Sequence, residues 1–73
     1  MKQVTFQTKF NLGDTIFAFD SSTLKLIRTE VKCIDFMLSK KELNIFYYGV
    51  DGTIANEIHC FATEEEFIKK IKP

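Results

Sequence analysis

The sequence has few of the residues and patterns that mark several large classes of protein. Its 73 residues include two cysteines, whereas the disulfide frameworks of short secreted chains usually use about four to eight. Its three glycines form no nucleotide-binding fingerprint, so no phosphate-cradling loop is predicted. No apolar run approaches the roughly 18 to 20 residues of a membrane span, and the first residues lack the hydrophobic stretch of a secretory signal. We therefore expect a soluble protein of the cytoplasm.

An excess of charge of either sign is also missing. Ten Lys and Arg residues are balanced by ten Asp and Glu residues. The chain as a whole therefore has no field that would attract nucleic acid or an anionic membrane. We expect no membrane partner, and the neutral charge disfavours a nucleic-acid partner.

Large apolar side chains, by contrast, are abundant. The chain contains eight Phe and two Tyr residues, and 45% of its residues are hydrophobic. A domain of this size buries only about 60% of the surface that its unfolded chain exposes, so it needs large side chains to offset the entropy of ordering. We predict a single folded domain over residues 1–73.

Stretches rich in aromatic and β-branched residues predict a mainly β chain of four to five strands. Polar turns separate these stretches, and Asp51-Gly52 is a strong hairpin signal because both central positions of a type I′ turn need a positive φ. The first dozen residues alternate loosely, which predicts a short edge strand or an extended arm. The predicted segments are 4–12, 15–19, 24–38, 43–48 and 54–61.

The long predicted strand 24–38 changes its alternation half-way. From Ile27 to Cys33 the apolar residues share one parity, and Ile34, Phe36 and Leu38 occupy the other. A one-residue shift turns every later side chain to the opposite face, so a β-bulge or sharp bend at Cys33-Ile34 is needed to return them to the core. Such a bend lets one strand serve two sheets of a small barrel.

The end of the chain changes to a helical period. The stretch 63–66 is a capping box, in which the Thr63 hydroxyl accepts from the Glu66 amide and the Glu66 carboxylate accepts from the Thr63 amide. The following residues form one apolar stripe, made of Phe67, Ile68 and Ile71. So short a helix needs tertiary contacts, and we expect it to bury these side chains and close one end of the barrel.

Two segments resemble the small SH3-like barrel proteins of bacterial phages and mobile elements. The stretch 10–17 is similar to the F-x-x-G-D-x-V-Y/F pattern that leads into a first barrel strand. The stretch 57–67 is similar to a last strand that runs into a V-F-x-T-x-E-E-A capped helix, although Phe67 stands where such sequences often have Ala. The resemblance implies a small SH3-like barrel of four to five antiparallel strands with a short C-terminal α-helix. It implies no particular activity, because such barrels bind proteins or nucleic acids or have no assigned function.

His59 and Cys60 form the pair that most suggests catalysis, because a thiol beside a histidine is a common nucleophilic arrangement. Neighbours in a strand point to opposite faces, so we expect Cys60 to face inward and His59 to face solvent. Together with Cys33, these residues also lack the paired spacing of zinc ligands. We therefore predict no enzyme activity, no metal and no cofactor, and free thiols in or near the core.

The aromatic residues are the best candidates for a binding surface. Their number exceeds what a barrel of this size is expected to enclose, and an exposed apolar patch often marks a partner site. Two pairs each share a strand face, while Tyr47 shares the opposite face with Ile45, and the sequence leaves open which set fills the core. The candidate partner-binding residues are Phe17, Phe19, Phe46, Tyr47 and Tyr48.

A second candidate surface is basic. Arg28 and Lys32 lie on the polar face of the long strand, and Lys40 and Lys41 lie at its end. Cations beside a Tyr ring suit single-stranded nucleic acid, although Glu30 interrupts this face.

We expect a non-enzymatic protein-interaction module, an accessory or regulatory protein of a phage or mobile element that acts by binding another protein. One alternative is a small nucleic-acid-binding barrel that uses the basic residues and a Tyr. The other is a homodimer that buries its surplus aromatic side chains against a second copy.

Overall fold

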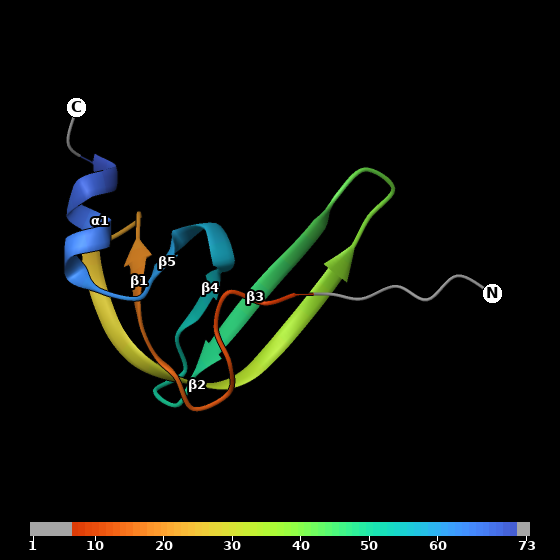
Figure 1. Cartoon of the computed structure of the whole chain (residues 1–73), viewed down its shortest axis with the longest axis horizontal. Helices are drawn as coiled ribbons and strands as arrows, with labels where there is room; N and C mark the ends of the chain where they lie inside the picture. The colour runs from red at the N-terminus through yellow and green to blue at the C-terminus, as the bar shows by residue number, and fades with distance from the viewer. Residues whose placement is uncertain (1–6, 72–73) are drawn as a thin grey trace.

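A computed structural model describes residues 7–71, which form a mainly β fold (Figure 1). Five antiparallel strands make one open sheet in the order β4-β3-β2-β1-β5, and one short helix follows them. The elements are β1 (Thr15–Asp20), β2 (Lys25–Leu38), β3 (Leu43–Gly49), β4 (Ile54–Asn56), the 3-10 helix η1 (Glu57–His59), β5 (Cys60–Phe61) and α1 (Glu64–Ile71).

Strand β2 is long and strongly bent, and it belongs to both halves of the sheet (Figure 1). Its first part pairs with β1 and its second part with β3. The register shifts between Val31 and Cys33, which places the extra residue at Lys32. Val31 is therefore buried before the shift, and Ile34 packs against the core after it. The predicted bulge is confirmed, slightly earlier in the strand than expected.

The core lies on the concave face of this bent sheet. The core contains Ile16 and Ala18 of β1 and Ile45 and Tyr47 of β3. The other parity of both strands faces outward, because successive side chains of a strand alternate between faces. The aromatic residues left half-buried on the outer faces are Phe17, Phe19, Phe46 and Tyr48.

The described part of the segment before β1 forms no strand. Residues 4–6 of the edge strand or arm expected there lie outside the described residues. Phe10 is buried in the core, and the segment then joins the sheet through the Gly13 amide, which donates to the Val31 carbonyl at 2.8 Å. The Val31 amide in turn donates to the Asp14 carbonyl at 2.9 Å.

The hairpin predicted at Asp51-Gly52 is present, but its turn type differs. Gly52 has a φ of 91°, whereas Asp51 has no positive φ. The Gly52 amide donates to the Gly49 carbonyl at 3.0 Å, and the Gly49 amide donates to the Thr53 carbonyl at 2.7 Å. This pattern fits a type I turn followed by a left-handed glycine, which joins strands through one residue more than a type I′ turn does.

The single strand predicted over residues 54–61 is wrong. The structure divides it into β4, η1 and β5. The Asn56 side chain caps η1, because its Oδ1 accepts from the Ile58 amide at 3.1 Å. The turn of η1 leaves Ile58 64% exposed, whereas Cys60 returns to the core as expected.

Helix α1 begins where the capping box predicts. The Glu66 amide donates to Thr63 Oγ1 at 3.2 Å, but the Glu66 carboxylate accepts from the Ala62 amide, not from that of Thr63. Among the apolar side chains of the helix, Phe67 is the one that is half-buried, whereas Ile68 and Ile71 are 42% and 62% exposed. The expectation that all three apolar side chains are buried is wrong, because the short helix turns one ring toward β1 and β5 and leaves the rest of its stripe outside.

Candidate functional site

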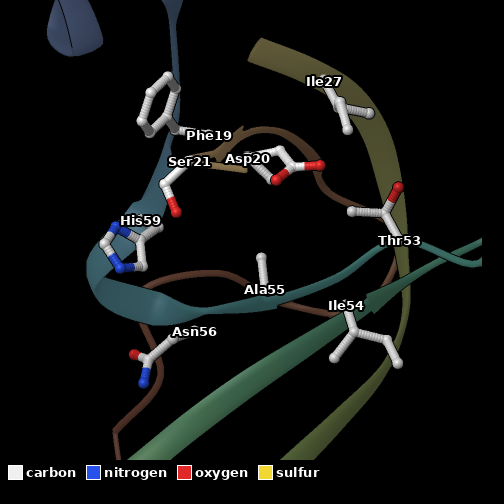
Figure 2. Close-up of a pocket in the computed structure, with 10 residues that line it drawn as sticks. Phe19, Asp20, Ser21, Ile27, Thr53, Ile54, Ala55, Asn56 and His59 are labelled. Carbon is white, nitrogen blue, oxygen red and sulfur yellow. The ribbon is translucent and has the colours of Figure 1, made fainter. Parts of the chain in front are cut away.

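A hollow of about 360 Å³ lies where the bent sheet brings β4 and η1 against β1 (Figure 2). Asp20 and Ser21, from the end of β1, lie across it from Ala55 and Asn56 of β4 (Figure 2). The Ala55 methyl group points into the hollow, whereas the neighbouring Ile54 side chain points away from it (Figure 2). The lining mixes apolar walls with carboxylate, hydroxyl, amide and imidazole groups.

A second hollow of about 250 Å³ lies between α1 and the η1–β5 segment. Its lining is largely apolar. Phe61 is paired with Phe17 in the sheet, so both rings lie on the outer face, which α1 covers. The Phe67 ring packs against Phe61 and Phe19, with centroid distances of 5.3 and 5.1 Å. The remaining apolar walls are Ile58 and Ile71, which are 64% and 62% exposed.

The two hollows share Phe19 and His59 at this edge of the sheet, but they lie on opposite sides of β1, because Ala18 and Ala55 of the first belong to the concave side and Phe61 of the second lies on the outer face. We call the combined surface the Phe19–His59 groove, with a polar half beside β4 and an apolar half beside α1. Its Asp, Glu, Lys and Arg lining residues are Asp20 in the polar half and Lys70 in the apolar half. The groove therefore has opposite charges at its two halves.

Local hydrogen bonds hold both charged groups in place. Asp20 Oδ1 accepts from the Ser22 hydroxyl at 2.7 Å and from the Ser22 amide at 3.0 Å. These bonds lower the pKa of the Asp20 carboxyl, the side-chain bond most, so it stays ionised at neutral pH. Lys70 Nζ lies 3.5 Å from the Ile58 carbonyl oxygen and 5.7 Å from the centre of the Phe61 ring. Its side chain lines the apolar half and also a neighbouring hollow that contains Glu57 and Glu66.

The candidate aromatic residues are divided among three places. Phe19 lines both halves of the groove. Phe17 is half-buried on the same strand face, and Phe46 and Tyr48 are half-buried on the outer face of β3, in the other half of the sheet. Tyr47 is 1% exposed, so its ring is out of reach of a partner.

The Tyr47 hydroxyl has hydrogen-bond partners inside the protein, which allows the side chain to be buried. It accepts from the Phe10 amide at 3.1 Å and donates to Glu57 Oε2, which also accepts from the Lys9 amide at 2.9 Å. Desolvation by burial, with Glu57 adding to it, raises the pKa of Tyr47 to about 12. The phenol thus joins three parts of the chain and has a structural role.

The basic candidates are exposed but separated. Arg28 lies on β2 opposite Phe17, and Lys32 is the extra residue of the bulge. Lys40 and Lys41 lie in the turn between β2 and β3, at the far end of this hairpin from α1 (Figure 1). At about 3.3 Å per residue, Arg28 and Lys40 are separated by roughly 40 Å of strand, with exposed Glu30 and Asp35 between them.

The two cysteines are free and in different environments. Cys60 is buried, and this burial raises the pKa of its thiol to about 11, which keeps it protonated and unreactive at neutral pH. Cys33 is exposed, in contrast to the expected position in or near the core, because it follows the register shift. Within residues 7–71, no three His, Cys, Asp or Glu side chains gather into a group that could hold a metal ion.

Sequence reasoning missed the apolar half of the groove. It assigned Phe67 and Ile71 to the core because it treated α1 as fully docked, and it treated 54–61, with Ile58, as one strand. A signal was present in Asn56-Glu57, where an N-cap residue is followed by an acid, as at many helix starts. His59 was expected at a solvated rim, and it is exposed there.

Comparisons with known proteins assign no relative: no family model, curated protein or solved structure matches the chain. The helices that residues 7–71 form are all too short or too polar to cross a bilayer.

Proposed function

We propose that this chain is a non-enzymatic protein-interaction module that binds another protein through the Phe19–His59 groove. The observation that carries the proposal is the apolar half, where Ile58 and Ile71 remain mostly exposed beside the Phe61 and Phe67 rings. Such a patch, rimmed by polar groups, is typical of interaction sites. A partner side chain that filled it would remove this apolar surface from water.

The arrangement of the sheet supports an SH3-like barrel as the finer description of the fold. One bent strand, β2, pairs with β1 on one side of its bulge and with β3 on the other. The two ends of the sheet also approach each other, since β4 and η1 contact β1. An accessory or regulatory role in a phage or mobile element follows from the sequence resemblance and is part of the same proposal.

Protein binding is favoured over nucleic-acid binding by the distribution of charge. A nucleic-acid groove needs cations along one track beside stacking rings. Here the cations are spread along β2 and its following turn, with acids between them. The groove itself contains one carboxylate and one lysine, which together offer phosphates no net attraction.

Site-specific photo-cross-linking tests the proposal in cells that carry this gene. A photoreactive phenylalanine replaces His59 in the groove, and the same residue replaces Lys41 as the exposed control outside it. We expect a protein adduct from position 59 that position 41 does not give. Adducts to RNA or DNA, or the same adducts from both positions, would contradict the proposal, and an adduct between two copies would indicate the homodimer instead.

A further inference from the structure

Strand β4 lies at one edge of the sheet, and part of its backbone faces away from the sheet. It pairs with β3 on one side and is the last strand in the order on the other. The Gly49 amide donates to the Thr53 carbonyl, so these two residues are a hydrogen-bonded pair, and such pairs recur at every second residue of an antiparallel ladder. In this register the next bonded residue of β4 is Ala55. The N–H and C=O groups of Ile54 and Asn56 therefore point away from β3.

These outward backbone groups can bind an added strand. One of them, the Asn56 carbonyl, accepts from the Cys60 thiol at 3.4 Å. Within residues 7–71, no group bonds to the other three, which are the Ile54 N–H, the Ile54 C=O and the Asn56 N–H. Unpaired groups at a sheet edge have the spacing that another strand requires, so they bind extended chains.

The polar half of the groove lies beside this edge and can receive a side chain of the added strand. Side chains next to Ala55 on the same face enter the hollow, because the Ala55 methyl group itself points into it (Figure 2). Ala18 and Ile27 belong to the same hollow and give it apolar walls. Of the Asp, Glu, Lys and Arg residues in the described part of the chain, only Asp20 lines it. The hollow therefore suits a long side chain with a cation at its end.

Asp20 can pair with such a cation although it already bonds to the turn that follows β1. Its Oδ1 accepts from the Ser22 hydroxyl and amide, and Thr23 adds further bonds to the carboxylate. An ionised carboxylate offers about four lone-pair sites and can share them with a lysine or arginine. The methylene groups of that side chain would then cover Ala18 and Ala55.

We propose that β4 binds an extended segment of a partner protein as an added strand, and that a lysine or arginine of this segment enters the polar half and pairs with Asp20. The next residue of the segment points to the outer face and is apolar, because it lies beside the Ile54 side chain, which is 62% exposed. A second copy of this chain fits less well, because its β4 contains only Ile54, Ala55 and Asn56 and brings no cation to Asp20. This inference rests on the proposed function and names the segment that the polar half binds.

A display library of random nine-residue peptides, selected on the whole chain, tests the inference. We expect the enriched peptides to share a lysine or arginine next to an apolar residue. Ile54→Pro removes an outward N–H at a position where an edge strand tolerates proline, and Ile54→Ala is the matched control that keeps this N–H. We expect the peptides to bind the Ile54→Ala protein within about threefold of the parent, and the Ile54→Pro protein about tenfold or more weakly.

Methylation of the peptide amides tests strand pairing on the unaltered protein. A strand bonds to its neighbour through alternate residues, so N-methyl groups should weaken binding at every second position beside β4 and have little effect at the positions between. Loss of this alternation would contradict strand pairing even if the Ile54→Pro protein were too unstable to use.

A charge test examines the role of Asp20. Asp20→Asn keeps an oxygen for Ser22 and removes the charge, and Asp35→Asn, at an exposed position on the outer face of β2, is its control. Asp20→Asn should weaken binding of a lysine-containing peptide by about threefold and leave unchanged the binding of a peptide with methionine in place of that lysine. Asp35→Asn should alter neither.

Equal binding to the two Ile54 variants, enrichment without a basic residue, or no enrichment at all would overturn the inference. Self-association of the parent protein that Ile54→Pro abolishes would also overturn it, because a second copy would then occupy the edge. If enrichment fails while position 59 still gives a specific protein adduct in cells, the proposed function stands and the inference is wrong. If the peptides bind as expected but no adduct forms, β4 recognises such peptides and the proposed function is wrong.

Discussion

Tyr47 connects parts of the chain that are far apart in the sequence. Its ring packs edge-on against Phe10 at a centroid distance of 5.4 Å, and its hydroxyl connects the segment before β1 with η1. The residue therefore fixes η1 at the edge of the groove without lining the groove itself.

Tyr47→Phe should lower the free energy of unfolding by about 1 to 3 kcal/mol, because the buried Phe10 amide loses its acceptor. Tyr48→Phe, on the outer face of β3, is the control and should change it by less than about 0.5 kcal/mol. Equilibrium urea unfolding measures both values. Equal effects of the two substitutions would show that the internal hydroxyl contributes nothing.

The raised pKa of Tyr47 also predicts a loss of stability in alkali. The neutral phenol is favoured in the folded state, where its pKa is about 12, over the unfolded state, where it is near 10.0. The contribution of this pKa difference to the free energy of unfolding is complete below pH 10. It should be lost as the pH rises to 12, and the total loss is about 2 to 3 kcal/mol.

The buried Cys60 thiol, with a pKa of about 11, adds to the same alkaline loss. The tyrosine's share is isolated by urea unfolding of the parent and Tyr47→Phe proteins at several pH values. The variant should lose less stability over this range, and parallel curves would contradict the prediction.

Gly49 is required for space, not for an unusual φ. A Cβ atom there would lie 2.4 Å from Thr29 Oγ1, 2.6 Å from Thr29 Cγ2 and 2.8 Å from Asp51 Oδ1. The Thr29 hydroxyl cannot easily move, because it bonds to Asp51 Oδ1 at 2.9 Å across the turn. Gly49→Ala should therefore destabilise the protein by about 1 to 3 kcal/mol.

A double-mutant cycle with Thr29→Ala tests this explanation. Removal of the threonine hydroxyl and methyl groups eliminates the two closest contacts and leaves the one with Asp51, so Gly49→Ala should cost less in the Thr29→Ala protein than in the parent. The same cost in both backgrounds would mean that the clash is not with Thr29.

At the scale of the elements, the apolar packing of α1 on the sheet depends on one ring. Phe67 contacts Phe19 and Phe61, while the other apolar residues of the helix are 42% or more exposed. A helix of 8 residues is too short to persist in water by itself, so its stability comes from this contact and from its cap.

Phe67→Ala should lower the free energy of unfolding by about 2 to 3 kcal/mol, less than for a fully buried ring because Phe67 is half-buried. Thr63→Ala removes one cap bond and should cost about 1 kcal/mol. Ile71→Ala, at an exposed position of the same helix, is the control and should change little. Urea unfolding gives the order of the three, and a Phe67→Ala protein as stable as the parent would mean that α1 is not part of the folded unit.

At the scale of the whole molecule, the bulge in β2 determines which side chains form the core. One extra residue, Lys32, lets Val31 and Ile34 face the same side. Deletion of Lys32 should turn the second half of β2 over and abolish cooperative unfolding, whereas Lys32→Ala should cost less than about 0.5 kcal/mol. Near-ultraviolet circular dichroism with urea unfolding distinguishes the two, and a deletion variant that unfolds cooperatively would disprove the register argument.

The strands, the bulge and the helix start could be predicted because each depends on local alternation or on a cap. The division of residues 54–61 was missed, because three β-favouring residues, Ile54, Ile58 and Phe61, outweighed a cap at Asn56. The groove could not be predicted, because it depends on how far the sheet curls and on which side of α1 docks. Burial of Tyr47 was not predicted for a similar reason, because its hydrogen-bond partner Glu57 lies on η1, which the sequence did not indicate.

The Phe67 ring has two roles. It packs α1 against the sheet, and it forms a wall of the apolar half of the groove. An occupant of that half adds contacts to the same ring, so it must also shift the local opening equilibrium of the helix toward the docked state. Exchange of the α1 amide protons with deuterium is then slowed by occupancy. The exchange rate of the α1 amide protons therefore indicates whether the groove is occupied.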